Sequence, residues 1–244
     1  LNIRGKDITY SPLFLCYAIV TKKGKIKLFI DKYKIKNAEH KINKIAEVHP
    51  RKSISKFLYT MEKNYVIGFD ESSIPCQFKI ICNNNHINTI NFTDPCIYPK
   101  AEKNYIELKG ARKANLRDGL SITKFIYWLK NNKNINNLDE IKAAKYLYKL
   151  RRSNHLFFSL SFETISAFGK NAALPHYRVS AKTNHKFYNN CIYLVDSGAQ
   201  YRDGTTDITR TIVLGNPTTE HKDRFTRVLK GHIALALEHF KYGE

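Results

Sequence analysis

Long hydrophobic runs are absent from this sequence. The longest uninterrupted apolar stretch is Leu13–Val20, eight residues, whereas a helix that spans a bilayer needs about 20. The N-terminal residues also lack the basic segment, apolar stretch and cleavage site of a secretory signal. We therefore expect no transmembrane helix and no membrane partner.

Cysteine and methionine are also scarce. The five cysteines include no C-x-x-C pair, and an odd number suits neither a disulfide framework nor a structural zinc site. We expect reduced thiols and a cytoplasmic location. Met61 is the only methionine. Because no Met begins the sequence, we interpret it as processed at its start or as a piece of something longer.

Acidic residues are few relative to basic ones. Lys and Arg total 41 against 21 Asp and Glu, so the formal charge is +20. This excess excludes an acidic disordered tail and invites a nucleic-acid interpretation. However, the basic positions are scattered, and no aromatic ladder alternates with them as binding to a single strand requires. A solvated lysine-rich surface and no nucleic-acid partner is the better interpretation.

The rest of the composition is that of a globular α/β (α+β) protein. Hydrophobic residues make up 43% of the 244, and a chain of this length buries roughly 70–75% of its unfolded surface in one or two domains. The predicted elements of the first domain, residues 1–97, are a hairpin of Leu13–Val20 and Leu28–Ile30, a helix over Ser53–Met61, and strands at Val66–Phe69 and Phe78–Ile81. Two prolines near residue 97 break this pattern, and we place a domain boundary there.

The second predicted domain, residues 98–244, begins with a helical pattern. Ile122, Phe125, Ile126 and Leu129 follow the i, i+3, i+4, i+7 spacing of one core-facing stripe. The elements predicted after it are a loop over Asn131–Asn137, a helix from Asp139 to about Arg151, a strand over Phe157–Ala167, a hairpin of Cys191–Val195 with Thr205–Leu214, and a helix from Thr219 to about Phe240 with Phe225, Val228, Leu229, His232 and Leu235 on one side.

Two carboxylates, Asp196 and Asp207, interrupt the strands of this last hairpin. Carboxylates on adjacent strands can hold metal ions if both side chains point the same way. A turn centred between Asp203 and Gly204 sets Asp196 opposite Thr211. The two carboxylates are then four residues out of step, about 13 Å at roughly 3.3 Å per residue, too far to share a metal.

A second register is equally compatible with the sequence. A loop centred at Tyr201 and Arg202, with a bulge at Gly204, sets Asp196 directly opposite Asp207, with Cβ atoms about 5 Å apart. Structural alternatives also exist for each residue. Asp196 can start a turn by accepting from nearby backbone N–H groups, and Asp207 can pair with Arg202 or Arg210. His176, after a proline, is by itself an ordinary loop histidine.

Four segments resemble the Xaa-Pro aminopeptidase (aminopeptidase P) family of the M24 creatinase and methionine aminopeptidase superfamily. They are the hairpin segment Asp196–Thr211 (DSGAQYRDGTTDITRT), the upstream segment Gly169–Tyr177 (GKNAALPHY), the helix segment Phe225–Leu235 and the N-terminal segment Asn2–Gly5. The resemblance covers essentially the whole chain. It implies a creatinase-like middle domain followed by the first half of a pita-bread catalytic domain.

The resemblance also implies a site and an activity. Asp196 corresponds to a ligand of one metal ion, Asp207 to a bridge between two divalent ions, usually manganese, and His176 to a histidine near the substrate. Such a pair of ions polarises a carbonyl and supplies a hydroxide near neutral pH. The implied reaction removes the N-terminal residue from peptides with proline in second position. Members of the family often form homodimers.

The chain departs from the family pattern after the hairpin. The family's remaining ligands are a His and two Glu, but the sequence has no H-G-x-G-H segment, and its later glutamates are only Glu220, Glu238 and Glu244. Two carboxylates hold divalent ions weakly, because hard cations take about six donors. We therefore expect a fragment that is inactive alone; a complementing C-terminal fragment would complete the site. The alternative is a non-catalytic pita-bread module that binds peptides or proteins.

Overall fold

The computed structural model describes residues 3–241 and 243. The chain forms two compact units, Leu1–Ile106 and Glu107–Glu244. Residues 1 and 2, and with them Asn2 of the N-terminal segment that resembles the family, lie outside the described part, as does Glu244. The helices of the described part include none with the length and apolar character needed to cross a membrane.

The first unit is built on two small sheets. Strands β1 (Tyr17–Val20) and β2 (Ile26–Phe29) pair antiparallel, and β3 (Glu47–His49) joins β2 in parallel. The parallel pair β4 (Val66–Phe69) and β5 (Asn88–Asn91) forms the other sheet. The predicted hairpin and the strand at 66–69 are thereby confirmed. The helical segments of this unit are α1 (Lys32–Ile35), α2 (Glu39–Ile42), η1 (Arg51–Ser53), α3 (Ile54–Tyr59), α4 (Cys76–Asn84) and α5 (Ile97–Ala101).

The predicted strand at Phe78–Ile81 is wrong, because these residues lie inside helix α4. Phe78, Ile81 and Cys82 follow helical spacing, and this face is turned toward the core beside Phe29 and Leu58. Pro75 precedes the helix, where a missing backbone N–H has no cost. A short apolar run does not distinguish a strand from one buried helix face.

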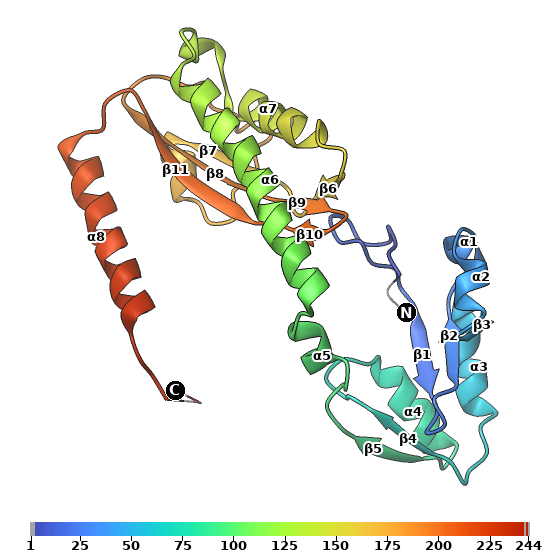
Figure 1. Ribbon diagram of the computed structural model, residues 1–244. Helices are drawn as coiled ribbons and strands as arrows, with labels where there is room; N and C mark the ends of the chain where they lie inside the picture. Colours follow the sequence, from blue (N-terminus) through green and yellow to red (C-terminus); the bar gives the residue numbers. More distant parts are fainter. Residues whose placement is uncertain (1–2, 242, 244) are drawn as a thin grey trace. The chain divides into compact units, whose positions relative to one another are not determined.

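The second unit has two long helices over one face of a sheet (Figure 1). Helix α6 (Tyr105–Lys130) and helix α7 (Glu140–Arg152) are separated by the short turn η2 (Ile135–Asn137). Asp139 caps α7 by accepting from the backbone N–H of Lys142. The predicted stripe is largely confirmed, since Ile122, Phe125 and Leu129 are buried in the core cluster and Ile126 packs against it.

Two three-stranded sheets complete this unit. One has the order β11-β8-β7 and the other β10-β9-β6. The strands are β6 (Phe157–Leu160), β7 (Ile165–Phe168), β8 (Cys191–Ser197), β9 (Ala199–Tyr201), β10 (Gly204–Thr205) and β11 (Ile208–Leu214), with the turn η3 (Gly169–Ala173) after β7. The single strand predicted over 157–167 is therefore two strands in different sheets.

Helix α8 (Thr219–Leu237) confirms the predicted final helix but has no buried residue. Thr218 and His221 form a reciprocal capping box at its start. Its apolar side chains are exposed, with Phe225 at 59% and Val228 at 73% of their full accessibility. The predicted apolar side is present, but no element of the described chain covers it.

Candidate metal centre

The observed register of the last hairpin is neither of the two predicted ones. Asp196 on β8 pairs with Thr209 on β11, midway between the predicted partners Thr211 and Asp207. Beyond Ser197, the hairpin continues as the pair β9 and β10 in the other sheet, with Gly204 opposite Tyr201. Asp207 lies between β10 and β11, where the returning strand changes sheets.

A tight backbone crossing sets this register. The N–H of Thr206 donates to the carbonyl of Ala199 at 2.9 Å, and the Ser161 hydroxyl donates to the carbonyl of Thr206 at 2.9 Å. A Cβ at Gly198 would lie 2.0 Å from the Thr206 carbonyl oxygen and 2.2 Å from the Ser161 hydroxyl. Only glycine allows this approach, so Gly198 and Thr206 fix the point at which both strands change sheets.

The crossing brings Asp196 and Asp207 together. Asp207 lies two residues before Thr209, the residue that pairs with Asp196, and the Thr209 hydroxyl donates to Asp196 Oδ1 at 2.9 Å. Burial of its carboxyl group raises the pKa of Asp207, and the negative charge of the neighbouring Asp196 raises it further. This holds although the residue as a whole is exposed. In the described chain, neither Arg202 nor Arg210 forms an ion pair with Asp207.

Asp196 lies on the face of the sheet opposite the helices. Cys191, Tyr193, Val195 and Ser197 of β8 are buried, while the alternating residues, Asp196 among them, are only half-buried. This alternation is the period-2 pattern of a strand with one covered face. Both carboxylates are therefore accessible from outside the unit and are not held in its core.

His176 lies in the loop after η3, in the left-handed conformation with φ of 55°. It is exposed. Among the residues that the structure describes, no hydrogen bond joins His176 to Asp196 or Asp207. The structure thus brings together the two predicted carboxylates, and it places the predicted histidine on a separate loop of the same unit.

A buried carboxylate, Glu140, holds that loop. Glu140 is fully inaccessible and accepts from the backbone N–H of Phe168 at 2.7 Å and of His185 at 3.0 Å. It also accepts from Asn171 Nδ2 at 3.0 Å and from the Tyr177 hydroxyl at 2.9 Å. Four donors satisfy the carboxylate without a cation. Asn171 and Tyr177 thus fix the loop from both sides of His176.

Helix α6 holds the tip of the hairpin. The guanidinium of Arg117 donates to both oxygens of Asp203 at 2.8 and 2.9 Å, and it lies 5.0 Å from the centre of the Tyr201 ring. The hydrogen bond with Arg117 lowers the pKa of Asp203. A Cβ at Gly110 would lie 2.1 Å from the Asp203 carbonyl oxygen, so the helix presents a small residue where the tip approaches.

Sequence reasoning missed the buried charged residues of this unit. Asp118 and Arg151 are both fully inaccessible and pair through two hydrogen bonds. A signal for Asp118 exists, because it precedes Ile122 by one helical turn and so lies on the same apolar stripe. A charged residue on a buried stripe needs a partner, but the sequence does not say which one.

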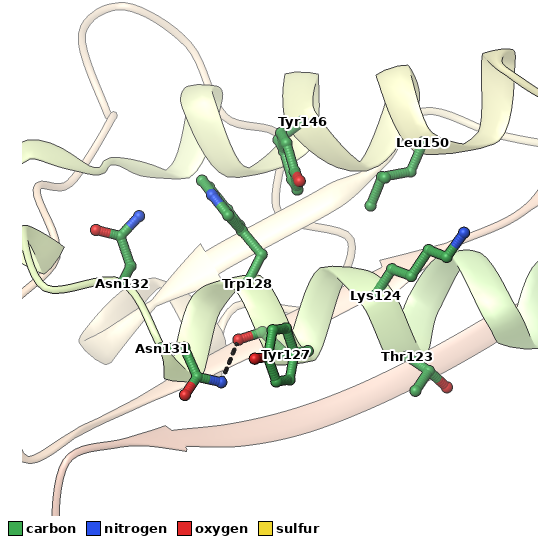
Figure 2. A pocket seen from close by; sticks show the side chains of 8 residues that line it. All are labelled: Thr123, Lys124, Tyr127, Trp128, Asn131, Asn132, Tyr146 and Leu150. Atoms are coloured by element: carbon green, nitrogen blue, oxygen red, sulfur yellow. Dashed lines mark hydrogen bonds between the residues drawn. The ribbon is translucent and has the colours of Figure 1, made fainter.

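A shallow groove between α6 and α7 lies apart from these residues (Figure 2). Its volume is about 730 Å³, and the Trp128 and Tyr146 rings stack at its base with centroids 4.0 Å apart. The side chains that line it are Thr123, Lys124, Tyr127, Trp128, Asn131, Asn132, Tyr146 and Leu150. None of them is a carboxylate or a histidine, so the groove lacks the groups for metal or acid–base chemistry.

The donor set fits a divalent metal only in part. Two adjacent carboxylates are the oxygen ligands that Mg²⁺ and Mn²⁺ prefer, and the repulsion that raises the pKa of Asp207 comes from the neighbouring Asp196. However, the described residues contain no group of three or more His, Cys, Asp or Glu that could hold a metal. Further ligands must come from outside the described residues to complete a tight site.

Comparison with known proteins identifies the family of the chain. The model of metallopeptidase family M24 matches residues 109–243, and that of the creatinase/prolidase N-terminal domain matches residues 1–107. The chain belongs to metallopeptidase family M24. Its fold is that of a creatinase-like N-terminal domain followed by part of a pita-bread M24 domain.

Individual relatives are Xaa-Pro aminopeptidases. Xaa-Pro aminopeptidase 1 of Dictyostelium discoideum is 35% identical over 247 residues, which are 98% of this chain and 38% of the relative. A crystal structure of an X-prolyl aminopeptidase from Caenorhabditis elegans, described as a cytosolic enzyme with a di-nuclear active site, is 34% identical with a TM-score of 0.83. The match covers 39% of the chain in that crystal structure and 95% of this M24 chain.

A more distant structure shows the fold alone. The prolidase from Pyrococcus horikoshii is 24% identical, with a TM-score of 0.69 over 90% of this chain. The M24 chain spans about two fifths of the length of the curated relatives that it matches.

Proposed function

We propose that this chain supplies part of the active site of a metal-dependent aminopeptidase that releases the N-terminal residue from peptides with proline in second position. The observation that supports this most is the convergence of Asp196 and Asp207 on the open face of the β11-β8-β7 sheet. The identity with Xaa-Pro aminopeptidases over nearly the whole chain supports the substrate class.

Each of the three residues has a role in this proposal. Asp196 and Asp207 would hold divalent ions, and His176 would stabilise the reacting carbonyl group or shuttle a proton to it. When bound, such ions, manganese in our proposal, would polarise the carbonyl and supply hydroxide near neutral pH. The chain's own contribution is to keep the two carboxylates adjacent and open to the peptide.

Activity in this proposal requires more polypeptide than the 244 residues. Two carboxylates leave most coordination positions of a divalent ion to water, and no third ligand accompanies them in the described part. A polypeptide carrying the family's His and two Glu would complete the site. We place the completed enzyme in the cytoplasm, where the five free cysteines stay reduced.

Complementation tests this proposal. The chain is incubated with Mn²⁺ and a peptide that begins Ala-Pro, with and without a separately produced C-terminal half of the Caenorhabditis elegans catalytic domain. We expect release of alanine only with both polypeptides, and loss of at least 100-fold in Asp196→Asn and Asp207→Asn. Asp223→Asn, an exposed carboxylate on α8, is the matched control.

Three outcomes would contradict the proposal in distinguishable ways. Release by the chain alone refutes the need for added ligands. Release that survives both substitutions refutes the metal roles. Binding of the peptide without metal and without any release, in every combination, favours a non-catalytic module that binds peptides.

A further inference from the structure

A buried carboxylate lies directly beneath the hairpin that carries the candidate metal ligands. Asp118 of α6 is fully inaccessible. It accepts from Arg151 Nε at 2.7 Å and Arg151 Nη2 at 2.8 Å. It also accepts from the Tyr201 hydroxyl at 2.8 Å and from the Thr206 hydroxyl at 2.8 Å. The Asp118 side chain therefore connects helices α6 and α7 with strand β9 and with the segment between β10 and β11.

The ion pair of Asp118 and Arg151 is held in this one arrangement. Arg151 is also fully inaccessible, and its Nη1 has no partner in the described part of the chain. Asp118 is thus its one counter-ion there. A buried guanidinium that binds a carboxylate through two parallel hydrogen bonds allows little rotation of either group. The pair is a rigid acceptor placed where the hairpin crosses between sheets.

The Thr206 hydroxyl connects this acceptor to the crossing. It donates to Asp118 and accepts from the backbone N–H of Ala199 at 3.0 Å. The Thr206 N–H in turn donates to the Ala199 carbonyl. The residue is therefore held on both sides, by its side chain and by its backbone, and Asp207 is the next residue along the chain.

We propose that Asp118, fixed by Arg151, is a positioning residue that acts through the Thr206 hydroxyl to hold Asp207 beside Asp196. The inference rests on the proposed function, since it concerns the position of Asp207, which is a metal ligand in that proposal. The physical reason is that Asp207 lies outside both β10 and β11 and so lacks the ladder hydrogen bonds that hold a strand residue.

Substitutions at Thr206 test the inference, because they leave the Asp118 and Arg151 pair intact. Thr206→Val keeps the shape of the side chain and removes the hydroxyl, while Thr206→Ser keeps the hydroxyl. Thr205→Val is the matched control, since it removes the neighbouring hydroxyl that donates to Gln200 at 2.6 Å. All are made in the 244-residue chain, and fluorescence of the single Trp128 reports whether the second unit is folded.

Two readouts are required. Amide hydrogen exchange without metal measures the order of residues 206–208, and electron paramagnetic resonance of free Mn²⁺ measures binding of that ion alone. For Thr206→Val we expect exchange at least tenfold faster and Mn²⁺ affinity at least tenfold weaker. For Thr206→Ser and Thr205→Val we expect both values within about threefold of the parent chain.

Unchanged exchange in Thr206→Val overturns the inference, and so does faster exchange with unchanged Mn²⁺ affinity, which assigns the network a structural role only. A Thr205→Val variant that behaves like Thr206→Val also overturns it. Failure of the parent chain to bind Mn²⁺ at millimolar concentration contradicts the proposed metal roles and with them the positioning role. The exchange data would then stand as a measure of hairpin order alone.

Discussion

At the scale of single residues, the carboxylates of the second unit fall into two kinds. Asp118 and Glu140 are fully buried, and each has four hydrogen-bond donors. Asp196 is half-buried, Asp207 is exposed, and the charge of Asp196 raises the pKa of Asp207. A satisfied buried carboxylate has a structural explanation, whereas two adjacent carboxylates repel each other, and either a proton or a bound cation relieves that repulsion.

Removal of one partner of the buried ion pair is expected to be severe. We expect Asp118→Ala to lower the free energy of unfolding of the second unit by about 3–5 kcal/mol, because Arg151 is left as an uncompensated buried charge. Denaturant unfolding followed by Trp128 fluorescence measures this unit specifically. The double variant Asp118→Leu with Arg151→Met is expected to be less damaging. A double variant at least as unstable as the single one would contradict the charge argument.

The pair of Arg117 and Asp203 predicts a pH dependence. Because the pKa of Asp203 is lowered below 3.8 in the folded chain, folding favours the ionised form. The pair therefore contributes its stability above about pH 4 and loses it as the pH falls through the folded pKa. We expect Asp203→Asn to be less stable at pH 6 and to show a shallower decline below pH 4. Equal slopes in the two proteins would contradict this assignment.

At the scale of elements, apolar periodicity predicted well where most helices and strands lie, but it did not predict how the strands of the last hairpin pair. The hairpin, the stripe of α6 and helix α8 follow from apolar spacing alone. The pairing of Asp196 with Thr209 does not, because it depends on a crossing where Gly198 touches the backbone of Thr206. Contacts between segments far apart in the chain, such as Asp118 with Thr206, leave no local signal. Phe78–Ile81 is predicted to be a strand for a different reason, because a short apolar run does not distinguish a strand from one buried helix face.

The crossing predicts opposite effects of alanine at two glycines. Gly198→Ala places a Cβ against the Thr206 carbonyl, and we expect a loss of more than about 2 kcal/mol, comparable to overpacking of a core. Gly119 lies inside α6, where an added Cβ has no neighbour within 4 Å. Gly119→Ala is expected to gain about 0.5–1 kcal/mol from helix propensity. Denaturant unfolding followed by Trp128 fluorescence compares the two variants, and similar effects on stability would refute the crossing geometry.

Helix α8 predicts a contrast with the buried helices. Leu229 is 45% exposed, so we expect Leu229→Lys to leave Trp128 unfolding within about 0.5 kcal/mol of the parent and to reduce binding of an apolar dye. Leu147 of α7 is fully inaccessible, and Leu147→Ala is expected to cost about 2–5 kcal/mol. A large loss from Leu229→Lys would show that α8 is packed in solution.

At the scale of the whole molecule, the chain joins two units with separate cores, and only the second carries the candidate site. The first unit has its own clusters, around Leu28 and around Phe29. The high positive charge is spread over both and takes no part in the chemistry proposed here. The metal effect should therefore appear in the second unit, which holds the single tryptophan.

Binding of a metal to the folded chain predicts a concentration-dependent gain in stability. At Mn²⁺ ten times above its dissociation constant, the free energy of unfolding should rise by about 1.4 kcal/mol. The gain should vanish in Asp196→Asn and Asp207→Asn and persist in Asp223→Asn. Trp128 unfolding over a Mn²⁺ series measures it. An equal gain in all variants would place the bound ion elsewhere.

The long reach of the Asp118 contact has a consequence for the order in which the molecule assembles. The hairpin pairs residues close in sequence, and such local contacts form early and fast. Thr206 and Asp118 are 88 positions apart, so their bond waits until α6 has docked. We therefore expect the hairpin to bring the aspartates near each other before the Thr206 hydroxyl reaches Asp118 and orders the segment that carries Asp207.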